Sequence, residues 1–101
     1  MDTRRMLDTK TIDFLKKTLR LYISDGRYKT FIFGSRATQT NRKYSDIDLG
    51  ISGPVPLSSK QYIQIKDALE ESDLPYKVDV VDFSEVSEEF KKVALRSTIR
   101  L

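Results

Sequence analysis

The sequence predicts an α/β (α+β) domain in which a small sheet packs against helices. Segments with apolar residues at helical spacing alternate along the chain with short segments of strand character, and turn residues separate them. The resulting order is helix, strand, helix, strand, helix, strand, helix, which is typical of a sheet covered by helices on one or both faces. The length of 101 residues fits one domain, spanning 1–101.

The first half of the chain supplies a helix, a strand and the start of a second helix. In residues 8–24 apolar side chains recur at helical spacing, and Asp25-Gly26 then ends the pattern. Residues 29–33 form a short strand that ends at Gly34, and Ser35 can cap a helix that follows. The side chains expected to face inward from the first helix are Ile12, Leu15, Leu19, Tyr22 and Ile23.

The second half supplies two strands and two helices. Residues 46–52 alternate between polar and apolar, as in a strand with one buried face. A helix begins at Ser58 or Ser59 and runs to about residue 72. Residues 76–83 form the third strand, and a last helix begins near Ser84 or Ser87. The side chains expected to face inward from these two helices are Tyr62, Ile65, Ala68, Leu69, Val86, Phe90, Val93 and Ala94.

The residue types that are missing limit the chemistry. The chain has no Cys and no His, which nearly excludes a zinc site and excludes serine–histidine and cysteine–histidine nucleophiles. A metal held by oxygen ligands would be Mg²⁺, Mn²⁺ or Ca²⁺. The net charge of +3 is weak for a protein that binds nucleic acid directly. Without an apolar run of membrane length or a secretory signal, the protein is expected in the cytoplasm, away from membranes.

Asp46 and Asp48 flank one isoleucine in the predicted strand 46–52. Residues two apart in a strand point to the same face, so both carboxylates lie opposite the apolar face that packs against helices. They are therefore expected on the side of the sheet that the helices leave open. Gly50 comes next on that face, where its lack of a side chain is expected to leave room for a ligand.

The third strand brings a further carboxylate. If its valines at 78 and 80 face the core, Asp79 points to the same side as Asp46 and Asp48, whereas Asp82 lies on the opposite face or past the strand's end. Three carboxylates on adjacent strands repel each other unless divalent cations lie between them. These three are therefore candidate metal ligands. The alternative is an ordinary half-exposed strand whose outer residues are polar.

Gly34-Ser35 lies at a strand–helix junction upstream of the aspartates. Gly34 lets the backbone approach a ligand closely, and Ser35 begins a helix whose free N–H groups attract phosphate. A phosphate cradle that faces a carboxylate metal site describes a site for a nucleoside triphosphate.

These motifs together resemble a known family. Gly34-Ser35-Arg36-Ala37, followed after Ser35 by ten residues and then Asp46-Ile47-Asp48-Leu49, is similar to the minimal nucleotidyltransferase (MNT) domains of the DNA polymerase beta-like superfamily. Val78-Asp79-Val80-Val81-Asp82 resembles the family's third-carboxylate strand. The resemblance implies a mixed twisted sheet and covers almost the whole chain. Thr38-Gln39 stand where many members have an arginine and a glycine, which puts substrate handling in doubt more than metal binding.

The resemblance also implies roles for the motif residues. Asp46 and Asp48 would hold Mg²⁺, with two ions expected and Mn²⁺ as a substitute, and Asp79 would complete the site and help deprotonate the attacking hydroxyl. Gly34 and Ser35 would hold the β- and γ-phosphates. Arg36 would be a charge partner of the triphosphate, or else a surface arginine in the first turn of a helix.

A domain this small has nothing after its last helix to hold an acceptor, so the acceptor is expected on another chain. Such members resemble the antitoxin of a two-gene module, which transfers AMP from ATP to a tyrosine of an all-helical HEPN toxin. The alternatives are a module that neutralises its partner by contact alone, and a transferase acting on a small molecule or an RNA end. Leu7, Phe14 and Leu21 lie seven apart off the main helical stripe, and form either a strip for the partner or a second buried side.

Overall fold

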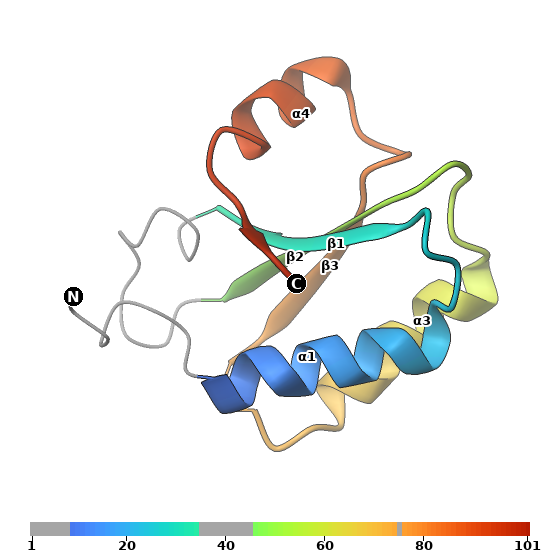
Figure 1. The fold of residues 1–101 in the computed structure, drawn as a ribbon, viewed down its shortest axis with the longest axis vertical. Helices are drawn as coiled ribbons and strands as arrows, with labels where there is room; N and C mark the ends of the chain where they lie inside the picture. The colour runs from blue at the N-terminus through green and yellow to red at the C-terminus, as the bar shows by residue number, and fades with distance from the viewer. Residues whose placement is uncertain (1–8, 35–45, 75) are drawn as a thin grey trace, which may run out of the picture.

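A four-stranded mixed sheet forms the centre of the molecule (Figure 1). The computed structural model describes residues 9–34, 46–74 and 76–101. The strands lie in the order β3-β2-β1-β4, in which β1 is antiparallel to β2 and β4, and β2 is parallel to β3. Their bounds are Lys29–Phe33 for β1, Ile47–Ser52 for β2, Val78–Asp82 for β3 and Ile99–Arg100 for β4. The prediction of a mixed sheet flanked by helices is confirmed.

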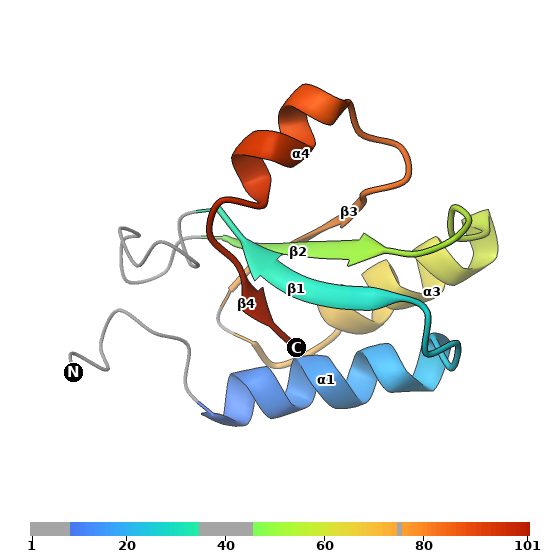
Figure 2. The same ribbon diagram turned by 45° about the horizontal axis from the view of Figure 1, so that its top comes forward.

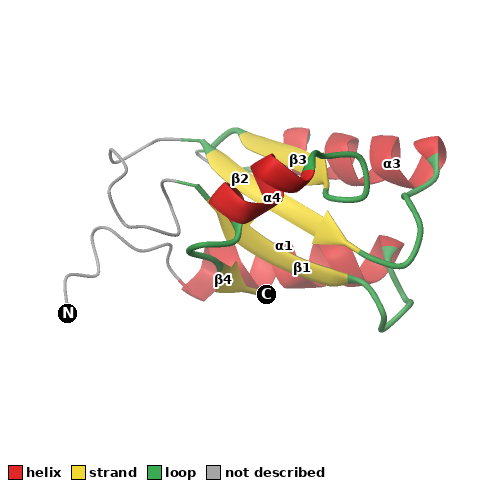
Figure 3. Cartoon of the chain, turned by 90° about the horizontal axis from the view of Figure 1, so that it is seen from above, coloured by secondary structure: helices red, strands yellow, loops and turns green. Residues whose placement is uncertain are grey.

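Helices cover both faces of this sheet. Figures 1 and 3 show α1 (Thr9–Tyr22) and α3 (Ser59–Glu70) on one face and α4 (Glu88–Ala94) on the other. The predicted start of α3 is confirmed, because Ser58 Oγ accepts a hydrogen bond from Gln61 N at 3.1 Å and Ser58 N donates to Gln61 Oε1 at 3.3 Å. This reciprocal pair satisfies backbone groups that the first turn leaves free. No helix among the described residues is long and apolar enough to cross a membrane.

The face under α1 and α3 holds an aliphatic core. The side chains of β2 that face it are buried completely, as its alternation predicted. Leucines from α1 and isoleucine and leucine from α3 close this core from outside. Its members are Leu15, Leu19, Ile32, Ile47, Leu49, Ile51, Ile65, Leu69, Val78 and Val80.

The opposite face holds an aromatic cluster, which contradicts the expectation that this side is open. Phe31 and Phe33 of β1 contact Phe83, which follows β3, with ring centroids 4.9 and 5.1 Å apart and the rings close to edge-to-face. That arrangement is the favoured one for aromatic pairs. The carboxylates of β2 and β3 therefore share their face with three buried rings and with α4.

Gly50 belongs to this cluster, and the expectation that it leaves room for a ligand is wrong. A Cβ at Gly50 would lie 2.6 Å from Cζ of Phe31 and 2.8 Å from Cε1 of Phe83. The missing side chain is therefore the space into which the two rings pack.

Replacing Gly50 by alanine is expected to destabilise the fold by about 1–3 kcal/mol, because the added methyl must displace rings in a packed core. Urea unfolding measures this loss. The matched control is Gly26→Ala, since a Cβ at Gly26 meets no atom within 4 Å, and its expected effect is within about 0.5 kcal/mol. Equal stabilities of the two variants would contradict this account of Gly50.

Three further details differ from the sequence-based expectations. The two-residue strand β4 was not predicted, and it extends the sheet by pairing with β1 near the C-terminus (Figure 2). None of the α4 residues is buried, and Phe90 and Val93 are 42% and 63% exposed. On α1, Phe14 packs against the aliphatic core while Leu21 is 78% exposed, so these two do not form one exposed strip. Leu7 lies outside the described residues, as does the helix expected after Ser35.

Candidate functional site

Asp48 and Asp79 lie side by side on the α4 face of the sheet. The register of the parallel strands pairs the two residues directly, and neighbouring strands are about 4.8 Å apart. The buried side chains of Ile47 and Leu49 before and after Asp48, and of Val78 and Val80 before and after Asp79, fix the direction of both carboxylates. The predicted shared face is therefore confirmed for these two residues.

Asp46 lies just before β2 and is exposed, and its charge acts on Asp48. Burial raises the pKa of Asp48 above its ordinary value, and the negative charges of Asp79 and Asp46 raise it further. All three causes disfavour the ionised carboxylate. A positive charge placed among the three side chains would offset the repulsion of Asp48 by Asp79 and Asp46.

Gly34, at the end of β1, is adjacent to this carboxylate pair. Its φ of +76° lies in the left-handed region, which L side chains rarely adopt. A Cβ at Gly34 would overlap Oδ2 of Asp48. Glycine is thus required here both for the backbone conformation and for the space beside Asp48. Ser35 and Arg36, the other predicted phosphate-binding residues, lie outside the described residues.

The donors at this place fit a hard divalent cation. All are carboxylate oxygens, which Mg²⁺ and Mn²⁺ prefer, and Gly34 leaves the volume beside Asp48 free. Within residues 9–34, 46–74 and 76–101, however, no three acidic side chains are arranged so that they could hold one ion together. The structure therefore provides a close pair, Asp48 and Asp79, with Asp46 near it.

Asp82 lies on the opposite face of β3 from Asp79, as the sequence predicted, at the strand's last position. Its Oδ2 accepts a hydrogen bond from Leu57 N at 2.8 Å, and its Oδ1 accepts one from Ser84 N at 2.9 Å. Asp82 thus holds the segment before α3 to the end of β3. Its carboxylate is engaged in structure and does not join the other three.

A cleft of about 420 Å³ borders the site at Gly34. The described residues that line it come from the end of β1 and from α4 with the turn after it: Phe33, Gly34, Phe90, Val93, Ala94, Arg96 and Ser97. Sequence reasoning missed this cleft because it assigned Phe90 and Val93 to the core. A larger cavity of about 520 Å³, lined by residues such as Tyr62 and Val86, lies towards the other end of β3 from Asp79.

The chain matches the family model described as "Polymerase beta, Nucleotidyltransferase" over residues 24–101. It is 36% identical over 95 residues to "Probable protein adenylyltransferase MntA" of Haemophilus influenzae. The aligned region covers 92% of this chain and 82% of that protein.

Solved structures share the fold. A toxin–antitoxin complex with AMP-PNP contains a chain that is 24% identical, with a TM-score of 0.70 over 87% of this chain and 69% of that one. A tri-AMPylated HEPN toxin of Shewanella oneidensis in complex with its MNT antitoxin contains another, also 24% identical, with a TM-score of 0.64 over 87% of this chain and 66% of that one.

Proposed function

The chain belongs to the polymerase beta nucleotidyltransferase family, and from this premise we propose that it transfers AMP from ATP to a hydroxyl of a partner protein. The partner is a HEPN toxin, and the chain is its antitoxin. Membership of the family makes the chain a nucleotidyltransferase.

Two relatives support a protein as the acceptor. The Haemophilus protein is named as a probable protein adenylyltransferase, and the Shewanella complex contains a HEPN toxin that carries AMP. The alignment with the Haemophilus protein covers most of both chains, which supports the assignment of the same activity to this chain. The proposed enzyme acts in the cytoplasm as one half of a hetero-oligomer.

The observation that carries the proposal is the pairing of Asp48 with Asp79 beside the left-handed Gly34. Asp48 and Asp79, with Asp46 near them, would hold Mg²⁺, which when bound neutralises the charge of the triphosphate. Gly34 lets the phosphates approach the backbone. Ser35 and Arg36 follow it in the sequence and would hold the β- and γ-phosphates with it.

The protein's own task in the reaction is to position groups and to accept a proton. The acceptor's hydroxyl oxygen forms a bond to the α-phosphorus of ATP, and the bond from that phosphorus to the oxygen that bridges to the β-phosphate breaks. Pyrophosphate leaves, and Asp79 accepts the hydroxyl proton. Asp48 points to the same side of the sheet as Asp79, so both can face one α-phosphate.

The test incubates the protein with ATP labelled at the α-phosphate and Mg²⁺, with and without a HEPN protein as the acceptor. We expect label on the HEPN protein, and its loss in Asp46→Ala. A tight complex that carries no label would show neutralisation by contact alone. Label on an RNA end or a small molecule, with none on the HEPN protein, would assign a different acceptor.

A further inference from the structure

Lys77, together with Asp46, Asp48 and Asp79, forms a square of four charged residues on the face that carries the carboxylates. It lies directly before β3, two residues before Asp79, and its side chain reaches the Asp79 carboxylate on that side. Ile47 N donates a hydrogen bond to Lys77 O at 2.8 Å, and extending the paired register by one residue places Lys77 beside Asp46. Asp48 and Asp79 form the other two corners. Three corners are anionic, and the fourth is a cation.

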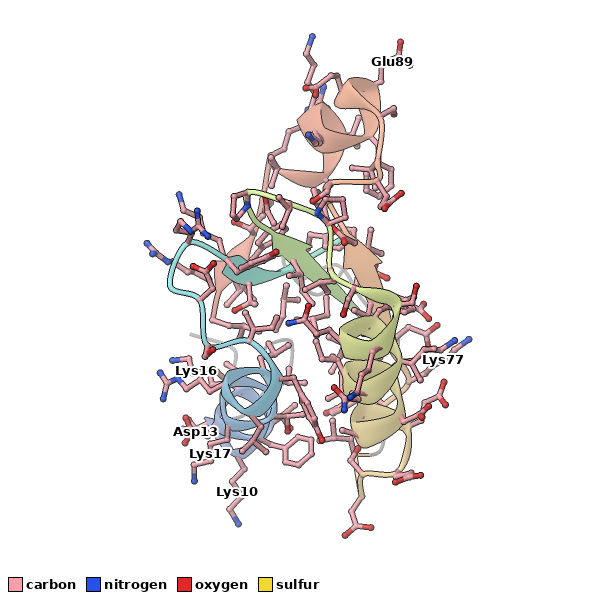
Figure 4. The ribbon with its side chains drawn as sticks, turned by 90° about the vertical axis from the view of Figure 1, so that its right-hand side faces the viewer. Lys10, Asp13, Lys16, Lys17, Lys77 and Glu89 are labelled. Carbon is pink, nitrogen blue, oxygen red and sulfur yellow. The ribbon has the colours of Figure 1, made fainter. Side chains whose placement is uncertain are left out.

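The ammonium group of Lys77 is directed at the carboxylate group of Asp79. Lys77 Nζ lies 3.9 Å from Asp79 Oδ1, with the side chains of Lys77 and Asp79 72% and 46% exposed. This is the one ion pair that the described residues show for any of the three carboxylates. Figure 4 shows Lys77 on the other side of the molecule from Lys10, Lys16 and Lys17, which project from α1.

We infer that Lys77 is a positioning residue that competes with the divalent cation for Asp79. In the metal-free protein its ammonium group offsets the repulsion among the carboxylates and holds the Asp79 oxygen towards β3's exposed edge. A cation that binds to Asp79 must displace this ammonium, and Lys77 thereby weakens the affinity of the site for metal. The inference rests on the metal site of the proposed function, and it assigns to this chain a residue that sets how tightly that site binds.

The expected size of the effect follows from the exposure of the pair. Because both side chains are largely solvated, the interaction is screened and has the modest strength of surface ion pairs. Removing the ammonium group should therefore tighten metal binding by about two- to fivefold. Lys77→Gln removes the charge and keeps much of the side-chain length. Lys77→Arg keeps the charge and should bind metal like the wild type.

The experiment measures the Kd of the full chain for Mn²⁺ by titration, without nucleotide or partner. Lys17→Gln is the matched control, because it removes the same charge from α1 on the far side of the molecule. We expect a lower Kd for Lys77→Gln alone. In metal-free buffer Lys77→Gln should also unfold at a lower temperature than Lys17→Gln, and saturating Mn²⁺ should abolish this difference.

The possible failures are distinguishable. If the wild type binds Mn²⁺ and Lys77→Gln has the same Kd as Lys17→Gln, Lys77 does not compete for Asp79, whereas the proposed function stands. If Lys77→Arg tightens binding as much as Lys77→Gln, the charge is not the cause and the inference is overturned. If the wild type binds no Mn²⁺ at millimolar concentration, the metal site itself is wrong and the inference falls with it.

Discussion

Replacing Asp48 by asparagine is expected to reduce AMP transfer by about 10²–10³-fold or more. Asparagine keeps the shape of the side chain but removes a negative oxygen that faces Asp79 across the parallel pair. The reaction depends on charge neutralisation around the triphosphate, and single electrostatic contacts at such sites have effects of this size. The measurement is the initial rate of label transfer to the partner at saturating ATP and Mg²⁺.

Asp82→Asn is the matched control for this variant. The Asp82 carboxylate accepts hydrogen bonds from Leu57 N and Ser84 N and lies away from the other three. We expect Asp82→Asn to lower the free energy of unfolding by about 1–2 kcal/mol, because the two hydrogen bonds weaken when the acceptor loses its charge. Its transfer rate at a temperature where it remains folded should stay within a few-fold of the wild type. Equal losses of activity in both variants would remove the distinction between Asp82 and the site.

The same Asp48→Asn variant should be more stable than the wild type when metal is absent. The folded state raises the pKa of Asp48, so the native protein holds this proton more tightly than the unfolded chain. The stability linked to that proton is fully present below the unfolded pKa of about 3.8 and is lost as the pH rises through the raised folded value. In the wild type the ionised Asp48 faces the negative charges of Asp79 and Asp46, whereas the asparagine variant carries no charge to bury.

For a half-exposed carboxylate this gain amounts to about 0.5 kcal/mol, or roughly 2–4 °C in Tm. Thermal unfolding in a chelating buffer at pH 7 measures it, and at pH 3 the difference should vanish. A variant less stable than the wild type at pH 7 would show that favourable contacts of the Asp48 carboxylate outweigh its repulsion by Asp46 and Asp79. A gain in stability on losing function is expected where a site assembles like charges.

Replacing Gly34 by alanine is expected to reduce AMP transfer by about 10²-fold or more. The new Cβ would overlap Oδ2 of Asp48, so the carboxylate must move, and a displacement of about 1 Å at a reacting centre has an effect of this order. The backbone at φ +76° also becomes strained, which destabilises the fold by about 1–2 kcal/mol. Transfer rates and urea unfolding measure the two effects separately.

Gly34→Asn distinguishes the two causes. Asparagine tolerates the left-handed conformation better than alanine but places a Cβ at the same point. We therefore expect Gly34→Asn to lose as much activity as Gly34→Ala with a smaller loss of stability. If Gly34→Asn retained activity within threefold of the wild type, the space beside Asp48 would not be the reason for glycine at this position.

Much of the fold could be predicted because several short segments carry unambiguous patterns. The alternation in residues 46–52 reports which side of β2 is buried, and the structure buries Ile47, Leu49 and Ile51 as that pattern requires. Ser58 and Ser87 each stand where a helix begins, with the side chain accepting a backbone hydrogen bond. Local chemistry determines these features, so the sequence is sufficient to locate them.

The features that the sequence did not reveal depend on contacts made at a distance. β4 consists of two residues that pair with Phe31 and Ile32 of β1, and two residues have no periodicity of their own. Gly50 has the same signal in the sequence whether a ligand or a ring occupies the space beside it. The apolar stripe of α4 was assigned to the core by its periodicity, whereas Phe90 instead lines a cleft beside Gly34.

The parallel pairing of β2 with β3 affects how activity depends on folding. Parallel neighbours need a long crossover connection, and here α3 forms part of that connection. Asp48 and Asp79 therefore meet only after the chain between them has folded over the aliphatic side of the sheet. The rate of AMP transfer should then fall over the same denaturant range as the far-ultraviolet circular dichroism signal of the folded protein. The reason is that no hairpin that forms early contains both carboxylates.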